Sequence, residues 1–231
     1  MSLSDSLRRR TQQHLAKNTL SKHDDRKVSV AMLRVVTYLN GRFRLRELGY
    51  SLEYVRSMKL TELIGVIRSY DRRTEFAPLT KSDTSCIKPD GGILVLRRDG
   101  DGQYKRVVLA VEMKHQGTNA KRLLEGLKKQ SMGNAIERLG KNLIGVRATL
   151  QYEKVTPFVC FGWGDDFAEG SSIRDRVITM NEFYPLNRIF VHKKDGYAPV
   201  SMFFREREWE EVELFDIMKE IAEAAITTYI Y

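Results

Sequence analysis

The order of apolar and polar positions divides the chain into segments with different periods. Residues 1–27 carry few apolar side chains among many polar and charged ones, so we expect a loosely ordered basic N-terminal arm. Apolar residues then recur every three or four positions in two stretches, which predicts two helices that cover a core. The first stretch contains Val28, Met32, Val35, Val36 and Leu39, and the second contains Leu52, Val55, Leu63, Ile67 and Tyr70.

The period changes to that of β-strands near the middle of the chain. ILVLR (93–97) and YKRVVLAVEMK (104–114) are rich in β-branched and large apolar residues, and the turn-forming sequence DGDG (99–102) lies between them. This pattern predicts a β-hairpin. PFVCFGW (157–163) and residues 187–192 are interpreted as further strands.

Helical patterns return on either side of these later strands. Residues 119–130 fit either a helix or an irregular basic segment, and residues 136–150 fit a helix that Gly140 and Gly145 weaken. The last helix is predicted from apolar residues at helical spacing, namely Trp209, Val212, Phe215, Met218, Ile221, Ala222, Ala225 and Tyr229. The mixture predicts an α/β fold with a central mixed sheet, and 231 residues suit one globular domain over 1–231.

The charge of the chain indicates a polyanionic partner. Lys and Arg number 39 against 30 Asp and Glu, giving a net charge of +9 that fits nucleic acid or a membrane surface. The excess lies in the middle, because residues 97–147 hold twelve basic and five acidic residues. No apolar run approaches the roughly 20 residues that span a bilayer, and Cys86 and Cys160 suggest neither a disulfide framework nor a zinc site. We therefore expect a cytoplasmic protein without a membrane anchor.

The predicted hairpin brings together three residues with catalytic chemistry. If the turn is centred on DGDG, paired residue numbers sum to about 201, so Asp90 of IKPDGG (87–92) lies opposite Val111 and beside Glu112. Glu112 and Lys114 of VEMKHQG (111–117) are two apart on a strand and share a face. Two carboxylates are hard oxygen ligands that suit Mg²⁺, which can neutralise the charge that develops in phosphodiester hydrolysis.

Lys114 has two possible catalytic roles that the sequence leaves open. Its ammonium group could lower the pKa of the attacking water, or it could stabilise the pentacovalent phosphorus. A plainer interpretation also exists for each motif alone, since Asp-Gly-Gly is commonly a tight turn and Glu-x-Lys on a strand is commonly a solvated ion pair. The combination of both motifs in one hairpin favours the catalytic interpretation.

These motifs resemble the EcoRI family of type II restriction endonucleases, which belongs to the PD...(D/E)xK nucleases. The resemblance covers IKPDGG, VVLAVEMKHQG (107–117), GNAIER (133–138) and Lys141-Asn142 in the same order. It implies a restriction-endonuclease-like core, with a central mixed five-stranded sheet flanked by helices. It also implies that Asp90, Glu112 and Lys114 are catalytic, with Asp90 and Glu112 binding Mg²⁺, and that the cut leaves 5′-phosphate ends.

The resemblance further implies which residues contact DNA. GNAIER would lie in the major groove and read the central AATT of a palindrome, where Asn can pair with adenine and Arg with a purine N7; the plainer interpretation is a helix N-cap followed by an exposed turn. The expected DNA-binding residues, including those near the scissile phosphate, are Lys88, His115, Gln116, Gly133, Asn134, Ala135, Glu137, Arg138 and Lys141. GAATTC is the expected site, and AATT with a different outer base pair is the alternative.

A palindromic site requires a protein with two-fold symmetry, so a homodimer acting on double-stranded DNA is expected. Two other functions remain open from the sequence. One is a PD...(D/E)xK nuclease of DNA repair or junction processing, which would cut a single strand or cut DNA according to its structure and not its sequence. The other is a catalytically inactive DNA-binding protein, which the intact Asp90, Glu112 and Lys114 argue against.

Overall fold

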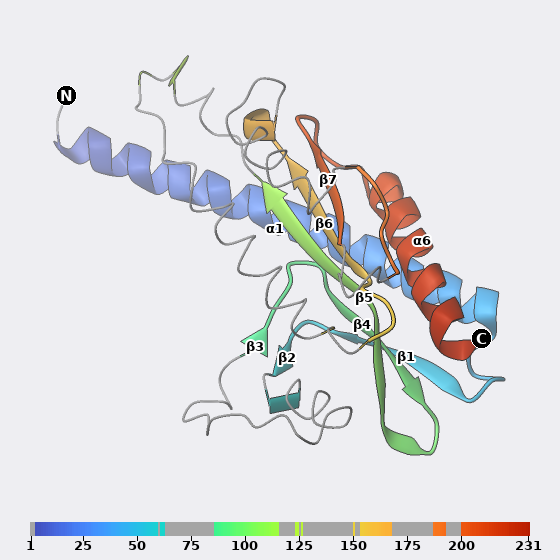
Figure 1. Ribbon diagram of the computed structural model, residues 1–231. Coiled ribbons are helices and arrows are strands. Elements are labelled where there is room, and N and C mark those ends of the chain that lie inside the picture. The colour runs from blue at the N-terminus through green and yellow to red at the C-terminus, as the bar shows by residue number, and fades with distance from the viewer. Residues whose placement is uncertain are drawn as a thin grey trace.

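The structure is a computed structural model, and it describes residues 3–59, 61–62, 86–115, 123–124, 126, 150, 153–167, 187–192 and 200–231. Within the first range, side chains are described from His23 onward, and the side chain of residue 103 is not described. Among the described residues, two long helices and a mixed β-sheet form the framework (Figure 1). This confirms the α/β class predicted from the sequence.

The described sheet has five strands in the order β1-β4-β5-β6-β7. The strands are β1 (Tyr50–Val55), β4 (Gly92–Arg98), β5 (Asp101–His115), β6 (Phe158–Trp163) and β7 (Ser201–Arg205). β1, β4 and β5 pair in antiparallel fashion, whereas β5, β6 and β7 are parallel. Two short strands, β2 (Met58–Lys59) and β3 (Cys86–Ile87), pair separately, and a 3₁₀ turn, η1 (Asp165–Phe167), follows β6.

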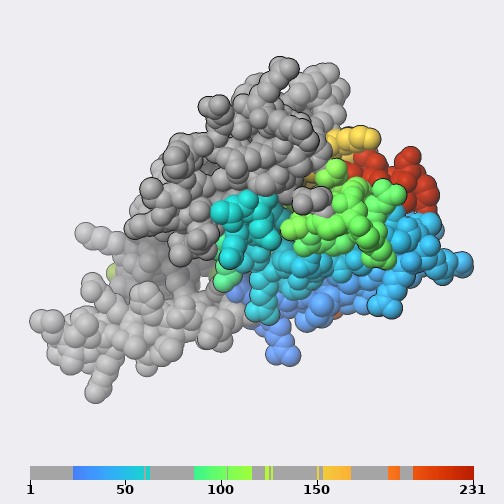
Figure 2. Space-filling model, turned by 90° about the horizontal axis from the view of Figure 1, so that it is seen from below, coloured from blue at the N-terminus to red at the C-terminus, as the bar shows by residue number. Residues whose placement is uncertain are grey.

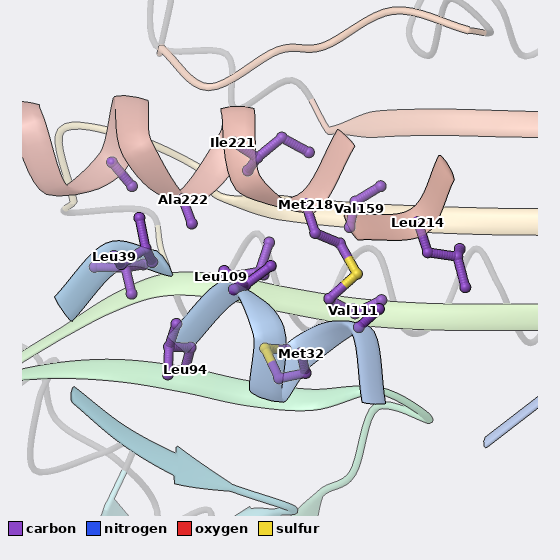
Figure 3. Close-up of a cluster of buried hydrophobic side chains, with 14 of the residues drawn as sticks. Met32, Leu39, Leu94, Leu109, Val111, Val159, Leu214, Met218, Ile221 and Ala222 are labelled. Atoms are coloured by element: carbon purple, nitrogen blue, oxygen red, sulfur yellow. The ribbon is translucent and has the colours of Figure 1, made fainter. Parts of the chain in front are cut away.

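Both long helices cover the same face of the sheet. α1 (Leu3–Phe43) and α6 (Glu211–Ile230) pack against each other and against β5. Figure 3 shows the core between them, where side chains spaced three or four apart on each helix meet those of β4, β5 and β6. The fully buried residues of this core include Met32, Leu39, Leu94, Leu109, Val111, Val159, Leu214, Met218, Ile221 and Ala222.

The opposite face of the sheet has its own apolar layer, so the central strands are buried on both sides. Ile93 and Val95 of β4 point into this second layer, while Leu94 and Leu96 of the same strand point toward the helices. A continuous apolar run such as ILVL is expected for a strand covered on both faces. In the space-filling view, the green atoms of the β4–β5 hairpin border the cyan and blue atoms of β1 and α1 (Figure 2).

The hairpin is confirmed, but its register differs from the prediction. Near the turn, Arg98 pairs with Asp101, and further along, Gly92 pairs with Val111. Irregularities between Leu94 and Val95 and between Arg97 and Arg98 shift the pairing in steps. Gly92 therefore occupies the position opposite Val111 that the sequence predicted for Asp90.

Three predicted elements need correction. The helix that was predicted to start near Val28 begins at Leu3, so the secondary structure expected for the arm was wrong from that residue on. Leu52 and Val55 lie in strand β1 and not in a second helix; the rest of that stretch, from Leu63, lies outside the described residues. Residues 187–192 form two isolated bridges, through Arg188 and His192, in place of a strand.

The predicted strand at 157–163 and the last helix are confirmed as β6 and α6, with α6 starting at Glu211 just after Trp209. Strand β7 was not predicted. Apart from Leu123 and Leu124, which are helical, and Gly126 and Leu150, the two helices expected between 119 and 150 lie outside the described residues. None of the described helices is long and apolar enough to cross a membrane.

Candidate active site

The two glycines after Asp90 place this carboxylate at the start of β4. The N–H of Gly91 donates to the Val111 carbonyl (2.9 Å), and the N–H of Gly92 donates to the Pro89 carbonyl (3.0 Å). A Cβ on Gly91 would collide with Val28 Cγ1 of α1 and lie 2.7 Å from Val111 Cβ. Gly92 has a φ of +76°, which favours glycine. The sequence Asp-Gly-Gly is therefore required both by close packing and by backbone conformation.

Glu112 and Lys114 project from β5 toward Asp90, as the sequence predicted. The backbone N–H of Asp90 donates to Glu112 Oε2 (3.1 Å), and the ammonium Nζ of Lys114 lies 3.1 Å from Asp90 Oδ2. Lys114 also forms a close ion pair with Glu112 Oε1. The structure thus brings all three predicted catalytic side chains into one cluster at the end of the hairpin.

Burial gives this cluster unusual electrostatics. Glu112 is 3% exposed, and burial raises the pKa of its carboxyl above the usual range, partly offset by the charge of Lys114. Burial alone would lower the pKa of Lys114, but the carboxylates of Glu112 and Asp90 outweigh it and raise that pKa. Lys114 therefore remains an ammonium ion that bridges two acids, in a position where a cation is favoured.

His115 faces away from this cluster, on the helix side of β5. Its ring stacks on the indole of Trp163, with centroids 3.9 Å apart and planes 12° apart. Trp163 Nε1 in turn donates to Asp24 Oδ2 of α1 (3.2 Å). Asp24 is 4% exposed, and burial raises its pKa to about 6. His115, the residue after Lys114, is therefore linked to α1 through Trp163 and Asp24.

The remaining DNA-binding predictions have different outcomes. Lys88 is exposed two residues before Asp90 and interacts electrostatically with Asp25 of α1. The other predicted residues are Gln116, Gly133, Asn134, Ala135, Glu137, Arg138 and Lys141, which all lie outside the described residues. Their roles therefore stay predictions.

Comparison with known proteins gives a family for this arrangement. The family model of restriction endonuclease EcoRI matches residues 11–230, which is nearly the whole chain and includes the site. The chain belongs to the EcoRI restriction endonuclease family. The recognition made from IKPDGG, VEMKHQG and GNAIER is thereby confirmed, and the family is one of type II restriction endonucleases.

Two curated relatives carry matching names. The chain is 29% identical over 214 residues to the type II restriction enzyme EcoRI of Escherichia coli, an alignment that covers 76% of each protein. It is 37% identical over 113 residues to the type II restriction enzyme RsrI of Cereibacter sphaeroides. That second alignment covers 46% of this chain and 39% of RsrI, so it spans well under half of the relative.

The sequence did not point to the contribution of α1 in this EcoRI-family site. Val28 packs on Gly91 of the candidate hairpin, Asp25 interacts electrostatically with Asp90, and Asp24 contacts Trp163 of the neighbouring strand β6, yet Asp24 and Asp25 were assigned to a loose arm. A signal was available, because Asp24 stands four residues before Val28, at the spacing that continues the same helical face. Trp163 was interpreted as the end of a strand, and its partner is 139 residues away.

Proposed function

We propose that this chain is a type II site-specific deoxyribonuclease that hydrolyses phosphodiester bonds of duplex DNA in the presence of Mg²⁺. The observation that carries the proposal is the clustering of Asp90, Glu112 and Lys114, with the Lys114 ammonium bonded to both acids. Family membership supports the same reaction class. The products would be 5′-phosphate ends.

The donor chemistry of the site fits Mg²⁺. Asp90 and Glu112 offer carboxylate oxygens, which are the hard ligands that Mg²⁺ prefers, and the backbone N–H of Asp90 orients Glu112. The bridging position of Lys114 shows that positive charge is stabilised between the two carboxylates. When bound, the ion would supply Lewis-acid stabilisation of the charge that develops on phosphate oxygens.

Lys114 has the protonation state needed to act on the phosphate. Because Glu112 and Asp90 raise its pKa, the side chain carries a full positive charge at neutral pH. An ammonium group held at the cluster can donate hydrogen bonds to a negatively charged oxygen during hydrolysis. Of the two roles that the sequence left open for Lys114, we propose this stabilisation of the pentacovalent phosphorus in preference to lowering the pKa of the attacking water.

The proposed target is a palindrome centred on AATT, with GAATTC as the first candidate. Support comes from GNAIER (133–138), whose Asn134 and Arg138 have the donors and acceptors that read purine edges. The enzyme named EcoRI is a relative over most of the chain. A palindrome is read by two copies of one chain, so we propose a homodimer that places one hairpin site on each strand.

The test is digestion of a sequenced plasmid with the purified chain in Mg²⁺, followed by sequencing of the product ends. Discrete linear fragments with ends inside GAATTC are expected, and EDTA should abolish them. If the fragments end inside a different palindrome centred on AATT, then only the outer base pair of the proposed recognition site would have to be changed. Nicked circles or scattered cuts would instead point to a repair-type nuclease, and binding without cutting would overturn the enzymatic proposal.

The matched control for digestion is Asp216→Asn, which removes one negative charge from the exposed side of α6. Asp216 pairs with Lys219 at 3.3 Å, within its own helix. This variant should cut the plasmid at the wild-type rate, whereas Asp90→Ala should not cut it. Its wild-type behaviour would show that loss of a carboxylate matters at the hairpin and not in general.

A further inference from the structure

Helix α1 carries two adjacent acids, Asp24 and Asp25, whose environments differ sharply. Asp24 is buried and accepts the hydrogen bond from Trp163 Nε1. Asp25 is exposed. Successive helical residues point about a quarter-turn apart, so when Asp24 is anchored to β6, Asp25 is directed to a different neighbour.

The turn of α1 that contains these acids is held at three points. Trp163 Nε1 donates a hydrogen bond to Asp24 Oδ2 (3.2 Å), and Lys27 Nζ lies 2.7 Å from Glu208 Oε1. Val28 packs so closely on Gly91 that a Cβ at position 91 would collide with it. Figure 1 shows α1 crossing the sheet at the end of β5, where the strand that carries Lys114 terminates. The position of Asp25 is therefore fixed relative to the catalytic hairpin.

This placement puts Asp25 on the side of α1 that packs against the loop carrying Asp90. Asp25 and Val28 are three residues apart, so they share a face of α1, and Val28 touches the residue that follows Asp90. The charged groups that act on the Asp25 carboxyl are Asp90, Lys114 and Lys88. Although Asp25 is largely open to solvent, the partial loss of its hydration and then the charge of Asp90 raise its pKa, while the two lysines oppose the shift.

The charge balance of this group has a direct consequence. Among the described residues, the carboxylates of Asp90 and Glu112 pair with the Lys114 ammonium group, and the carboxylate of Asp25 interacts electrostatically with Asp90, Lys114 and Lys88. The group therefore holds three carboxylates and two ammonium groups. One negative charge is thus in excess among these five described groups before any cation is present. Such an excess attracts a divalent cation and repels a phosphate that approaches without one.

We propose that Asp25 is a positioning residue of the cation site, which adds a third carboxylate to the field that attracts the divalent ion without being a direct ligand. This inference rests on the proposed function, because it assigns α1 a part in cation binding at the same site. Asp25 makes DNA engagement depend on the cation, since it favours the ion and disfavours bare phosphate.

The test uses Asp25→Asn in the full chain, with Mn²⁺ as the probe and the free-ion signal in electron paramagnetic resonance as the readout. Mn²⁺ accepts the same oxygen ligands as Mg²⁺. We expect Mn²⁺ affinity to fall by roughly 10-fold, the scale typical of residues just outside a metal's ligand set. Asp25→Glu should restore most of it, and Asp216→Asn should leave it unchanged.

A second readout separates this role from a structural one. In EDTA, fluorescence anisotropy with a labelled duplex containing GAATTC should show Asp25→Asn binding about 2- to 5-fold tighter than wild type, because a repulsive charge is gone. A structural role would weaken both Mn²⁺ and DNA binding, and that result would overturn the inference. Unchanged Mn²⁺ affinity in Asp25→Asn would also overturn it.

These outcomes are distinguishable from failure of the proposed function. If the wild-type chain binds Mn²⁺ and cuts DNA while Asp25→Asn matches it in every assay, then the role of Asp25 alone is excluded. If the wild-type chain neither binds Mn²⁺ nor cuts DNA, then the nuclease proposal itself fails, and the role of Asp25 fails with it.

Discussion

Lys114 reaches across the hairpin to Asp90, with Nζ 3.1 Å from Oδ2, although the two residues are 24 positions apart in the chain. The same ammonium group is paired with the buried Glu112. A lysine that neutralises two acids stabilises the cluster and holds a positive charge where the proposed phosphodiester hydrolysis would use one. Its loss should therefore separate cation binding from catalysis.

Lys114→Ala is expected to lower the single-turnover rate of DNA cleavage by about 100- to 1000-fold, the usual effect of removing one group that stabilises developing charge. Binding of Mn²⁺ should persist, because Asp90 and Glu112 remain and no ammonium group competes with the ion. The two quantities can be measured by gel assay and by electron paramagnetic resonance. Asp90→Ala serves as the contrast and should lose both. A Lys114→Ala protein that cuts at the wild-type rate would exclude the assigned role.

Gly91→Ala should damage both folding and activity. The new methyl group would collide with Val28 and approach Val111, and overpacking of this kind costs about 1–3 kcal/mol. The loop would move Asp90 away from Glu112. We expect a lower midpoint of urea unfolding together with slower cleavage. Gly100→Ala is a useful comparison, because its site in the β4–β5 turn has open space but a φ of +77°, so its cost should be confined to backbone strain.

Asp24→Asn should stabilise the protein at neutral pH. Burial raises the pKa of Asp24 from 3.8 to about 6, so the folded state binds this proton more tightly than the unfolded state. Wild-type stability therefore falls as pH rises from about 4 to about 6, by roughly 2–3 kcal/mol. Asparagine mimics the protonated acid and can still accept from Trp163.

The measurement for Asp24→Asn is urea unfolding at a series of pH values. The two proteins should coincide near pH 4, and the variant should be more stable above pH 6. His23 and Lys27 lower this pKa while Glu208 raises it, so their charges are already included in the shift. A variant that is less stable than wild type at pH 7 would show that the charged carboxylate is needed.

Glu213→Gln should change the stability of the protein with a pH dependence opposite to that expected for Asp24→Asn. Hydrogen bonds from Arg205, together with the charge of Arg207, lower the pKa of Glu213 from 4.5 to about 2. A lowered pKa gives stability that is present above pH 4.5 and is lost as pH falls toward 2. Because the side chain is 32% exposed, solvent screening reduces the effect to about 1–2 kcal/mol.

Thermal unfolding of the Glu213→Gln variant followed by circular dichroism can check this expectation. The variant should have a lower unfolding temperature than wild type at pH 7, and this difference should become smaller below pH 4.5. Glu220→Gln, which changes an exposed acid on the same helix, should differ little from wild type at either pH. An equal loss of stability at every pH would assign the effect to packing and not to charge.

The sequence predicted the hairpin and its acids because their determinants are local. The turn signal, the apolar strands and the Glu-x-Lys spacing all lie within about thirty residues. The register was wrong by two positions at Gly92 because irregularities after Leu94 and Arg97 depend on packing that no pattern reveals. Local signals therefore identified the site but not its alignment.

Elements set by long-range packing were harder to predict. Leu52 and Val55 are three apart, a spacing that fits a helix, but pairing with β4 makes them a strand. Ser201–Arg205 is short and lacks alternation because both of its faces are covered, so it resembles neither standard pattern. The link from Trp163 to Asp24 joins residues that no local pattern connects.

The strand that carries Glu112 and Lys114 has a neighbour close in sequence on one side and a distant one on the other. β4 pairs with β5 through a tight turn, whereas β6 begins more than forty residues after β5 ends. Local pairings form quickly during folding, and distant parallel pairings form slowly. We therefore expect the acids to meet on the hairpin early, and the pairing of Glu112 with Cys160 of β6 to form later. We expect refolding to form the hairpin and the β5–β6 pairing as separable kinetic events.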